Sequence, residues 1–337
     1  MKISIDRPLV IAEIADAHYG SLDRAKEMAK ASKDVGCDFA KFQHHLPSFE
    51  MLRNIPESSN MKEPLYEFLE KNALTIEQHI ELKEYCDSIE IKYLCTPFSR
   101  EAAVEIEENI SPDLYKIGSG ELTDIPTLDI IANFGKPMIV STGMSTIEEI
   151  DETYRFLVNR VPQLVLMNCT SAYPPSARDI FLSFIPVMRD RYPGATIGHS
   201  DHMPDIYTSL GAVALGAMVV EKHVTIDSNL IGPDDGVSIT FSEMSRLVTG
   251  VNEIYQALNS DKKVLESELP IQKWARRSLV YLESLDAGTV IRPEHIWGKR
   301  PGTGVPSKNY TNFIGKRLTR SVAKNTLLRV EDFEDLV

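Results

Sequence analysis

Reactive side chains follow the ends of several short apolar segments of this chain. The segments read AEIADAH, AKFQ, LCTPF, YKIGSGE, IVSTG, LMNCTSAY, IGHSDH and VEKHVT, and helix-like stretches separate them. Carboxylates, amines, hydroxyls and imidazoles bind anions and metals and transfer protons, so their convergence predicts an enzyme. The candidates from this pattern are Glu13, Lys41, Thr96, Lys116, Ser119, Glu121, Ser141, Ser171, Ser200, His202 and His223.

Two of these candidates are histidines, His202 and His223, at the ends of the last two apolar segments. Neutral imidazole is a ligand for Mn, Zn, Fe or Co, and an open coordination position lets such a metal polarise a carbonyl. A hydrogen-bonded pair of histidines without a metal is the alternative, because two ligands make an incomplete site. His199 lies either near this pair or inside its strand.

An anion site is predicted from the two lysines and the sequence GSGE at 118–121. Glycines around Ser119 let backbone amides and the hydroxyl approach a phosphate closely, and Lys116 points to the same face. Ser141 and Ser200 add hydroxyls from neighbouring segments. The alternatives are a tight turn at GSGE and solvated lysines at Lys41 and Lys116.

The carboxylates Glu13, Glu121 and Asp234 can orient sugar hydroxyls or move protons. Pairing with Lys41 or Lys116 is their structural alternative. Near the C-terminus, KRPGTG places Arg300 in a turn, where it either clamps an anionic ligand or lies on the surface.

Eight such segments alternating with helical patterns predict a (β/α)8 barrel with its chemistry at the C-terminal ends of the strands. The first helix begins after a cap at Ser21 and ends at Gly36, and Thr75 and Ser145 are predicted caps of later helices. An insertion between Gln43 and Thr75 lies on the catalytic side.

The predicted domains are a barrel over residues 1–260, a linker over 261–275 and a small β-rich domain over 276–337. The last barrel helix is predicted over 241–260, and the connector that follows reads as charged and only weakly apolar.

Composition excludes several partners. A formal net charge of −13 disfavours nucleic acid and anionic lipid, no apolar run is long enough to span a membrane, and we expect a cytoplasmic protein. The four cysteines form neither a CxxC pair nor a disulfide framework, so we expect reduced core residues, with Cys95 and Cys169 in buried strands.

In order along the chain, AEIADAHYG, AKFQ, CTPF, YKIGSGE, STGM, CTSAYP, SDH, EKHVT, GPDDGVS and KRPGTG resemble the motifs of the sialic acid synthase family. The resemblance implies a TIM barrel followed by an antifreeze-like (SAF) domain. It also implies condensation of phosphoenolpyruvate with an N-acetylated amino sugar, giving a nine-carbon 2-keto acid and phosphate.

By the same resemblance, His202 and His223 ligate Mn(II), with Mg(II) and Co(II) as alternatives, Glu13 positions the metal-bound water and Glu121 lies at the reacting centre. Tyr173 and Asp234 contact the sugar, and Arg300 acts in trans in a domain-swapped homodimer. The residues that would hold phosphoenolpyruvate are Lys41, Asn60, Thr96, Lys116, Ser119, Ser141 and Ser200.

Departures from the family pattern cluster on the sugar side, at Ala17, Ser171, Ser228 and Asp235. By the resemblance, N-acetylmannosamine is the first candidate acceptor. The CTS sequence also resembles synthases of legionaminic and pseudaminic acid, which implies the 2,4-diacetamido-trideoxy hexoses as alternative acceptors. A metal-dependent aldolase or lyase on this fold, and a binding protein without turnover, are the remaining alternatives.

Overall fold

The structure, a computed structural model, describes residues 3–55, 63–226, 234, 236–258 and 261–334. The chain forms two compact units, Met1–Leu258 and Asn259–Val337.

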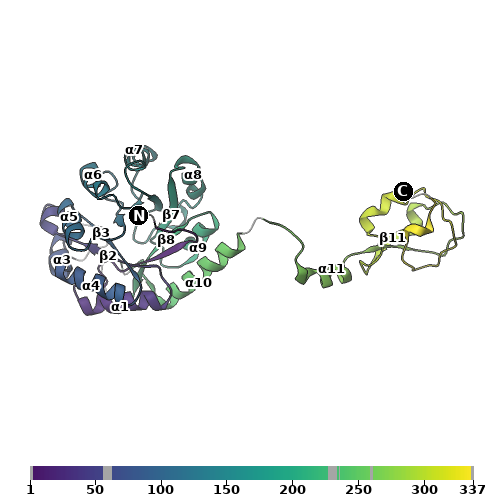
Figure 1. Cartoon of the computed structure of the whole chain (residues 1–337), viewed down its shortest axis with the longest axis horizontal. Helices are drawn as coiled ribbons and strands as arrows, with labels where there is room; N and C mark the ends of the chain where they lie inside the picture. Colours follow the sequence, from purple (N-terminus) through teal and green to yellow (C-terminus); the bar gives the residue numbers. More distant parts are fainter. Residues whose placement is uncertain (1–2, 56–62, 227–233, 235, 259–260, 335–337) are drawn as a thin grey trace. The chain divides into compact units, whose positions relative to one another are not determined.

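The first unit is a parallel β-barrel surrounded by helices, which confirms the predicted (β/α)8 fold (Figure 1). Strand order is β3-β2-β1-β8-β7-β6-β5-β4, β3 lies next to β4, and the short β9 pairs with β8. The strands are β1 (Leu9–Glu13), β2 (Phe39–His44), β3 (Lys92–Pro97), β4 (Tyr115–Ile117), β5 (Met138–Ser141), β6 (Leu164–Cys169), β7 (Ala195–Asp201), β8 (Val219–Thr225) and β9 (Ile239–Thr240). The helices are α1 (Leu22–Asp34), α2 (Pro47–Glu50), α3 (Leu65–Asn72), α4 (Ile76–Ser88), α5 (Arg100–Asn109), α6 (Ile125–Asn133), α7 (Ile147–Leu157), α8 (Phe184–Arg191), α9 (Tyr207–Ala214) and α10 (Phe241–Ala257), with a 3₁₀ turn, η1 (Ala177–Asp179).

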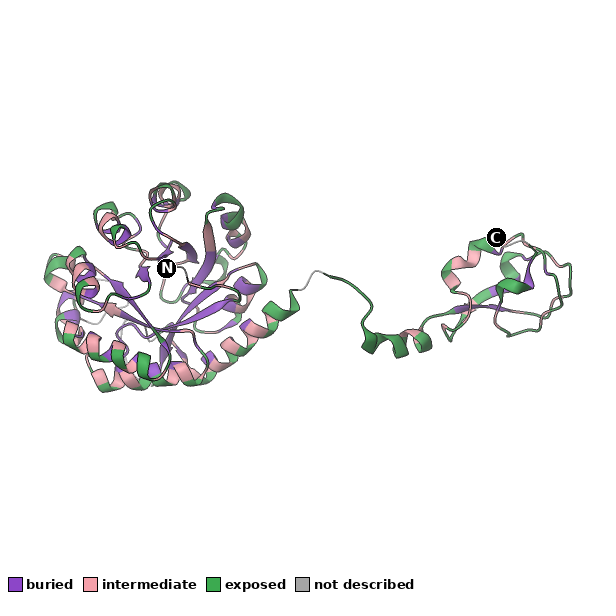
Figure 2. Cartoon of the chain, viewed as in Figure 1, coloured by how far each residue is buried: buried purple, intermediate pink, exposed green. Residues whose placement is uncertain are grey.

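The alternation of side chains along the strands builds two apolar layers. Val10 and Ala12 of β1 belong to the large cluster between strands and helices, whereas Leu9 and Ile11 belong to a smaller cluster inside the barrel, with Ile3 and Ile5 against it. Figure 2 shows the strands as buried, while the helices present exposed outer faces. Because strand side chains alternate with a period of two, the residues above the inner cluster point into the barrel mouth.

Helix caps were predicted with one error. Ser21 caps α1, and Thr75 caps α4 through a capping box with Gln78. The predicted cap Ser145 is wrong by one residue, because α7 is capped by Thr146, whose backbone N–H also donates to Glu149 at 2.7 Å. The Ser145 hydroxyl instead donates to the Gly143 carbonyl, 3.2 Å away.

Three of the four cysteines are buried and unpaired as predicted, namely Cys37, Cys86 and Cys95. Cys169 departs from the expected core position. It is the last residue of β6 and lines the cavity at the barrel mouth, because its place in the alternation points it inward above Met167.

The second unit has a small core of its own, formed by Leu279, Tyr281 and Ile296 with neighbouring apolar residues. Its two strands, β10 (Ser278–Tyr281) and β11 (Ile296–Lys299), are antiparallel. The segment expected to be a plain connector contains a helix, α11 (Leu269–Ala275), in which Pro270 occupies the first turn. The 3₁₀ turns of this unit are η2 (Glu266–Glu268), η3 (Pro293–His295), η4 (Ser307–Asn312) and η5 (Val330–Asp332).

No helix within the described residues is long and apolar enough to cross a membrane. The cytoplasmic location stays a prediction.

Candidate active site

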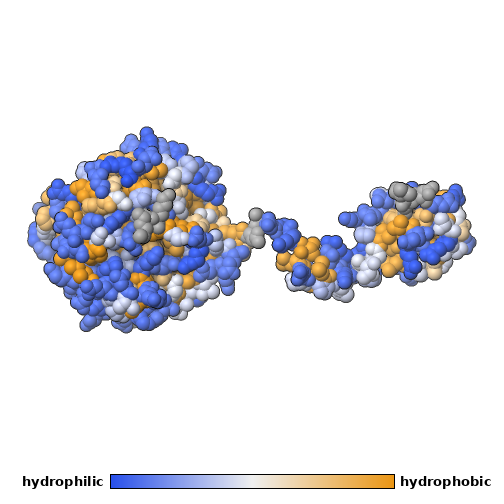
Figure 3. Space-filling model, in the orientation of Figure 1, coloured by the Kyte–Doolittle hydropathy of each residue, from blue (hydrophilic) through white to orange (hydrophobic). Residues whose placement is uncertain are grey.

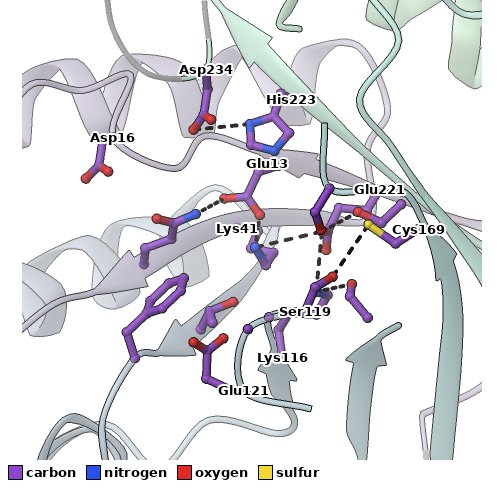
Figure 4. Close-up of a pocket in the computed structure, with 18 of the residues that line it drawn as sticks. Glu13, Asp16, Lys41, Lys116, Ser119, Glu121, Cys169, Glu221, His223 and Asp234 are labelled. Atoms are coloured by element: carbon purple, nitrogen blue, oxygen red, sulfur yellow. Dashed lines mark hydrogen bonds and ion pairs between the residues drawn. The ribbon is translucent and has the colours of Figure 1, made fainter. Parts of the chain in front are cut away.

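A cavity of about 430 Å³ opens among the C-terminal ends of the barrel strands. With two exceptions, the site residues predicted from sequence line it, and Figure 4 shows several of them pointing toward one another. The exceptions are Asn60, which lies outside the described residues, and Arg300, which belongs to the second unit. The lining residues from the prediction are Glu13, Lys41, Thr96, Lys116, Ser119, Glu121, Ser141, Ser171, Tyr173, Ser200, His202, His223 and Asp234.

Two buried lysines form one end of the cavity, which we call the lysine end. Lys41 and Lys116 are 3% and 2% exposed, so the alternative of solvated lysines is wrong. Lys116 donates to the Ser141 hydroxyl at 2.7 Å. Burial lowers the pKa of Lys41 to about 8, while Glu221 opposes this effect. Ammonium groups that are already buried and lie close to hydroxyls suit a phosphate or carboxylate ligand.

Carboxylates lie beside both lysines. Glu13 forms an ion pair with Lys41, and the strand register accounts for it, because Glu13 of β1 lies beside Lys41 of β2. Glu221 lies 3.5 Å from the Lys116 ammonium and 3.9 Å from that of Lys41, and accepts from the Ser200 hydroxyl at 3.1 Å. Burial would raise the pKa of Glu221, but the two lysines lower it.

Glu221 was missed by the sequence analysis although a signal was present. It precedes the candidate His223 by two residues on β8, so strand alternation directs both side chains into the barrel. Gln43 is related to Lys41 in the same way on β2, and it also lines the cavity.

The imidazoles of His202 and His223 lie together at a second corner of the cavity, with ring centroids 5.2 Å apart. Tyr173 packs on His202 at 4.3 Å. Nδ1 of His202 donates to the Thr170 carbonyl at 2.7 Å, which leaves Nε2 free to accept or to bind a metal. Nδ1 of His223 lies 3.5 Å from the Asp234 carboxylate.

The electrostatic environments of the two imidazoles differ. Burial, His202 and Lys41 hold the pKa of His223 well below its ordinary value. Burial would also lower the pKa of His202, but Cys169, the Thr170 carbonyl and Asp234 raise it. His199 is not part of this corner, because it is buried in β7 and bonds to the Asn168 carbonyl at 3.0 Å.

These donors fit an open metal site. No group of three His, Cys, Asp or Glu side chains able to hold a metal occurs among the described residues. Two imidazoles leave coordination positions of a divalent ion for water or substrate, as in a catalytic site.

Glu121 follows β4 at the end of the GSGE loop. Burial, assisted by Glu50, raises its pKa to about 7, and its Oε2 has no hydrogen-bond partner among the described residues. A Cβ at Gly118 would lie 2.4 Å from that oxygen, so only glycine leaves room for the carboxylate. The carboxylate that pairs with Lys116 is Glu221 and not Glu121. In the same loop, the Ser119 hydroxyl accepts from the Gly143 backbone N–H at 3.0 Å.

Besides the lysine end and the histidine corner, the cavity has a wall that was not predicted from the sequence. It consists of Asp16, Gln43, His45, Glu50 and Phe98, which follow or end β1, β2 and β3 or lie on α2. The insertion between β2 and α4 contributes Glu50 to it, in agreement with the expected catalytic-side location of that segment.

Arg300 has partners within the second unit. Its guanidinium lies over the Trp274 ring at 4.5 Å, and Nε donates to the Ala275 carbonyl at 3.3 Å. Trp274 is 65% exposed, so the pair is an accessible aromatic and cationic surface.

Comparison with known proteins agrees with this architecture. The chain is 32% identical to the N,N'-diacetyllegionaminic acid synthase of Campylobacter jejuni, over 96% of this chain and 99% of that protein. It is 30% identical to the human N-acetylneuraminate-9-phosphate synthase, over 96% and 91%. The structure of the N-acetylneuraminic acid synthetase of Leptospira borgpetersenii superposes with a TM-score of 0.72 at 28% identity, covering 80% of this chain and 91% of that one.

The SAF domain model matches residues 276–334 and the NeuB family model matches residues 28–263. The relatives are synthases, which are transferases, and the chain is an enzyme of this type. The chain belongs to the NeuB family.

Proposed function

We propose that this enzyme condenses phosphoenolpyruvate with an N-acetylated amino sugar and releases phosphate. The observation that carries the proposal is the pair of buried lysines in a cavity that also holds two adjacent imidazoles. C3 of phosphoenolpyruvate forms a bond to the aldehyde carbon of the open-chain sugar, water adds at C2, and inorganic phosphate leaves. The product is a nine-carbon 2-keto acid.

The lysine end binds phosphoenolpyruvate in this proposal. Lys41 and Lys116 neutralise its carboxylate and phosphate, and the Ser141 hydroxyl, which accepts from Lys116, keeps its proton for the same oxygens. The hydroxyls of Ser119 and Ser200 donate to Cys169 and Glu221, and would turn to the ligand when it binds. Thr96 is 1% exposed and its hydroxyl has no partner among the described residues, so it is free for the ligand. Asn60 stays a predicted contact outside the described residues.

His202 and His223 would hold a divalent metal, with Mn(II) as the first candidate and Mg(II) or Co(II) as alternatives. When bound, the metal supplies Lewis acidity toward the sugar aldehyde. Tyr173 lies against His202, Asp234 lies near His223, and Ser171 lines the same cavity; these three residues would orient the sugar.

Glu13 and Glu121 have different roles. Glu13, ion-paired with Lys41 and close to the imidazoles through the register of β1 with β8, would position water at the metal. Glu121, whose pKa is raised to about 7, can give or take a proton near neutral pH at the reacting centre.

We further propose a homodimer in which Arg300 of one chain serves the barrel of the other. Each unit exposes apolar side chains that suit such an association. Figure 3 shows apolar surface over α11, where Ile271 and Trp274 are 61% and 65% exposed. On the barrel, Phe49 and Met144, both in segments at the strand ends that surround the cavity, are 60% and 73% exposed. Sedimentation as a monomer at micromolar concentration would remove the role in trans.

The reaction is tested with the purified full-length chain, phosphoenolpyruvate and Mn(II). N-acetylmannosamine and the 2,4-diacetamido-trideoxy hexoses are supplied in parallel, and phosphate release and product mass are followed. We expect phosphate and a nine-carbon 2-keto acid in equal amounts. Use of free pyruvate without phosphate release would instead establish the aldolase alternative.

Two lysine variants, one in the cavity and one outside it, provide a test and its matched control. Lys116→Met should lose turnover because the phosphoenolpyruvate site loses a buried charge. Lys83→Met removes a partly exposed lysine of α4, paired with Asp87, and should keep full activity.

A further inference from the structure

The wall formed by Asp16, Gln43, His45, Glu50 and Phe98, which we call the acidic wall, has no role in the reaction proposed above. Its centre is a fully hydrogen-bonded histidine. His45 Nδ1 lies 2.9 Å from one oxygen of the Glu50 carboxylate, and His45 Nε2 lies 3.0 Å from Gln43 Oε1.

The hydrogen bonds assign a positive charge to His45. The Gln43 amide nitrogen donates to Glu13 at 3.3 Å, which fixes the amide orientation and makes Gln43 Oε1 an acceptor. Both ring nitrogens of His45 then face acceptors and both carry hydrogen, as in an imidazolium. The ring stacks on Phe98 with centroids 4.4 Å apart, which also suits a cation.

Asp16 is the residue of this wall that lacks a hydrogen-bond donor. It is 7% exposed, it lines the cavity, and its carboxylate accepts no hydrogen bond from any described residue. In Figure 4 it lies apart from the bonded network. The two N–H groups of His45, the nearby cation, are already committed to Glu50 and Gln43. A carboxylate that lines the cavity and has no protein donor is free to accept a hydrogen bond from a ligand.

Apolar side chains also line the cavity, on a helix that approaches the loop after β1. Leu65 and Leu69 of α3 are lining residues. Helix α3 lies against the loop that carries Asp16, because a Cβ at Gly20 would be 3.3 Å from the Asn72 backbone. An acetamido group offers an amide N–H together with a methyl group, whereas a hydroxyl offers only the donor. The acidic wall and the α3 leucines match the acetamido group in both respects.

We propose that Asp16 is a specificity-determining residue of the acceptor site. Its carboxylate accepts a hydrogen bond from the N–H of a second acetamido group, in addition to the one that all candidate acceptors share, and Leu65 and Leu69 cover the methyl. The inference rests on the proposed condensation. It makes a 2,4-diacetamido-trideoxy hexose the preferred acceptor over N-acetylmannosamine.

The test compares kcat/KM for the two acceptors in wild type, Asp16→Ala and Asp16→Asn, with the full-length chain, phosphoenolpyruvate and Mn(II). A hydrogen bond to a charged group corresponds to a loss of roughly ten- to hundredfold, so Asp16→Ala should lose that much kcat/KM for the diacetamido acceptor. Its kcat/KM for N-acetylmannosamine and its KM for phosphoenolpyruvate should stay within about twofold of wild type. Asp16→Asn keeps an acceptor oxygen and should lose less.

Asp113→Ala is the control, because Asp113 is exposed and precedes β4, at the opposite end of the barrel from the cavity. If Asp16→Ala does not fold, the selective loss in Asp16→Asn carries the test. Equal losses for both acceptors, no loss, or a wild-type preference for N-acetylmannosamine would each overturn the assignment of Asp16. Absence of phosphate release by wild type with every acceptor would overturn the proposed condensation instead.

Discussion

Replacing Glu221 with Gln tests whether a carboxylate keeps the lysine end charged. Glu221 lies 3.9 Å from the Lys41 ammonium, and both side chains are buried. At this separation two charges interact by about 4 kcal/mol when the effective dielectric constant is about 20. Since one pKa unit corresponds to about 1.36 kcal/mol, removing the charge should lower the pKa of Lys41 by roughly two to three units.

The protonation of Lys41 at neutral pH depends on its pKa in the wild type. With a pKa of about 8, Lys41 in the wild type is about nine-tenths protonated at pH 7. In Glu221→Gln the same lysine should be mostly neutral, and it must regain a proton when the phosphoenolpyruvate anion binds. Binding to the variant at pH 7 should therefore take up close to one more proton than binding to the wild type.

Calorimetry of phosphoenolpyruvate binding in two buffers with different ionisation enthalpies measures this proton uptake. The difference between variant and wild type isolates Glu221, because protonation of the ligand itself is common to both. Glu105→Gln is the control, since Glu105 pairs with His44 and does not line the cavity. Equal proton uptake by wild type and Glu221→Gln would refute the electrostatic reasoning.

Three further predictions address neighbouring parts of the structure. Gly118→Ala should lower kcat at least tenfold by displacing Glu121. Gly120→Ala is the control and should leave kcat unchanged, because a Cβ there meets nothing within 4 Å. A loss of kcat in both variants would indicate a general effect on the loop. Burial lowers the pKa of His18 to about 4, so the unfolded state binds more protons between pH 6.5 and 4, and stability is lost as the pH falls through that range. The free energy of unfolding should fall by about 3 kcal/mol over this range. His18→Asn should reduce the difference in unfolding free energy between pH 7 and pH 4.5, measured by urea unfolding. The same difference in wild type and variant would exclude His18 as the cause. His202→Ala should abolish tight Mn(II) binding measured by metal analysis after dialysis, and retention of the metal would remove His202 from the site.

Much of the barrel and its cavity could be predicted because both depend on local pattern. Each strand is a short apolar run, and each ends where polar residues begin, so the carboxyl ends of the strands locate the site. The alternation of side chains also predicts two further lining residues. Residues two positions from a predicted inward residue point the same way, which identifies Glu221 from His223 and Gln43 from Lys41.

The acidic wall could not be predicted in this way. His45 and Glu50 are five residues apart, and their contact depends on how α2 folds back over the barrel mouth. Asp16 lies beyond the end of β1, where the period of two no longer applies. Helix α11 was missed for another reason. It is only seven residues long, and Leu269, Ile271 and Trp274 are exposed, so the pattern contains no buried face.

The charges of the cavity explain how an acidic site can serve an anionic substrate. Six carboxylates line the cavity with the two lysines, namely Glu13, Asp16, Glu50, Glu121, Glu221 and Asp234. Glu13 and Glu221 lie beside the lysines, where their negative charge offsets the burial of the ammonium groups. Burial raises the pKa of Glu121 to about 7, so this carboxyl group can be neutral near pH 7, and burial also raises the pKa of Asp16. The cavity is thus divided into an end that attracts anions and a wall that accepts hydrogen bonds from the acceptor. In the proposed reaction, phosphoenolpyruvate would bind at the lysines and the neutral sugar at the acidic wall.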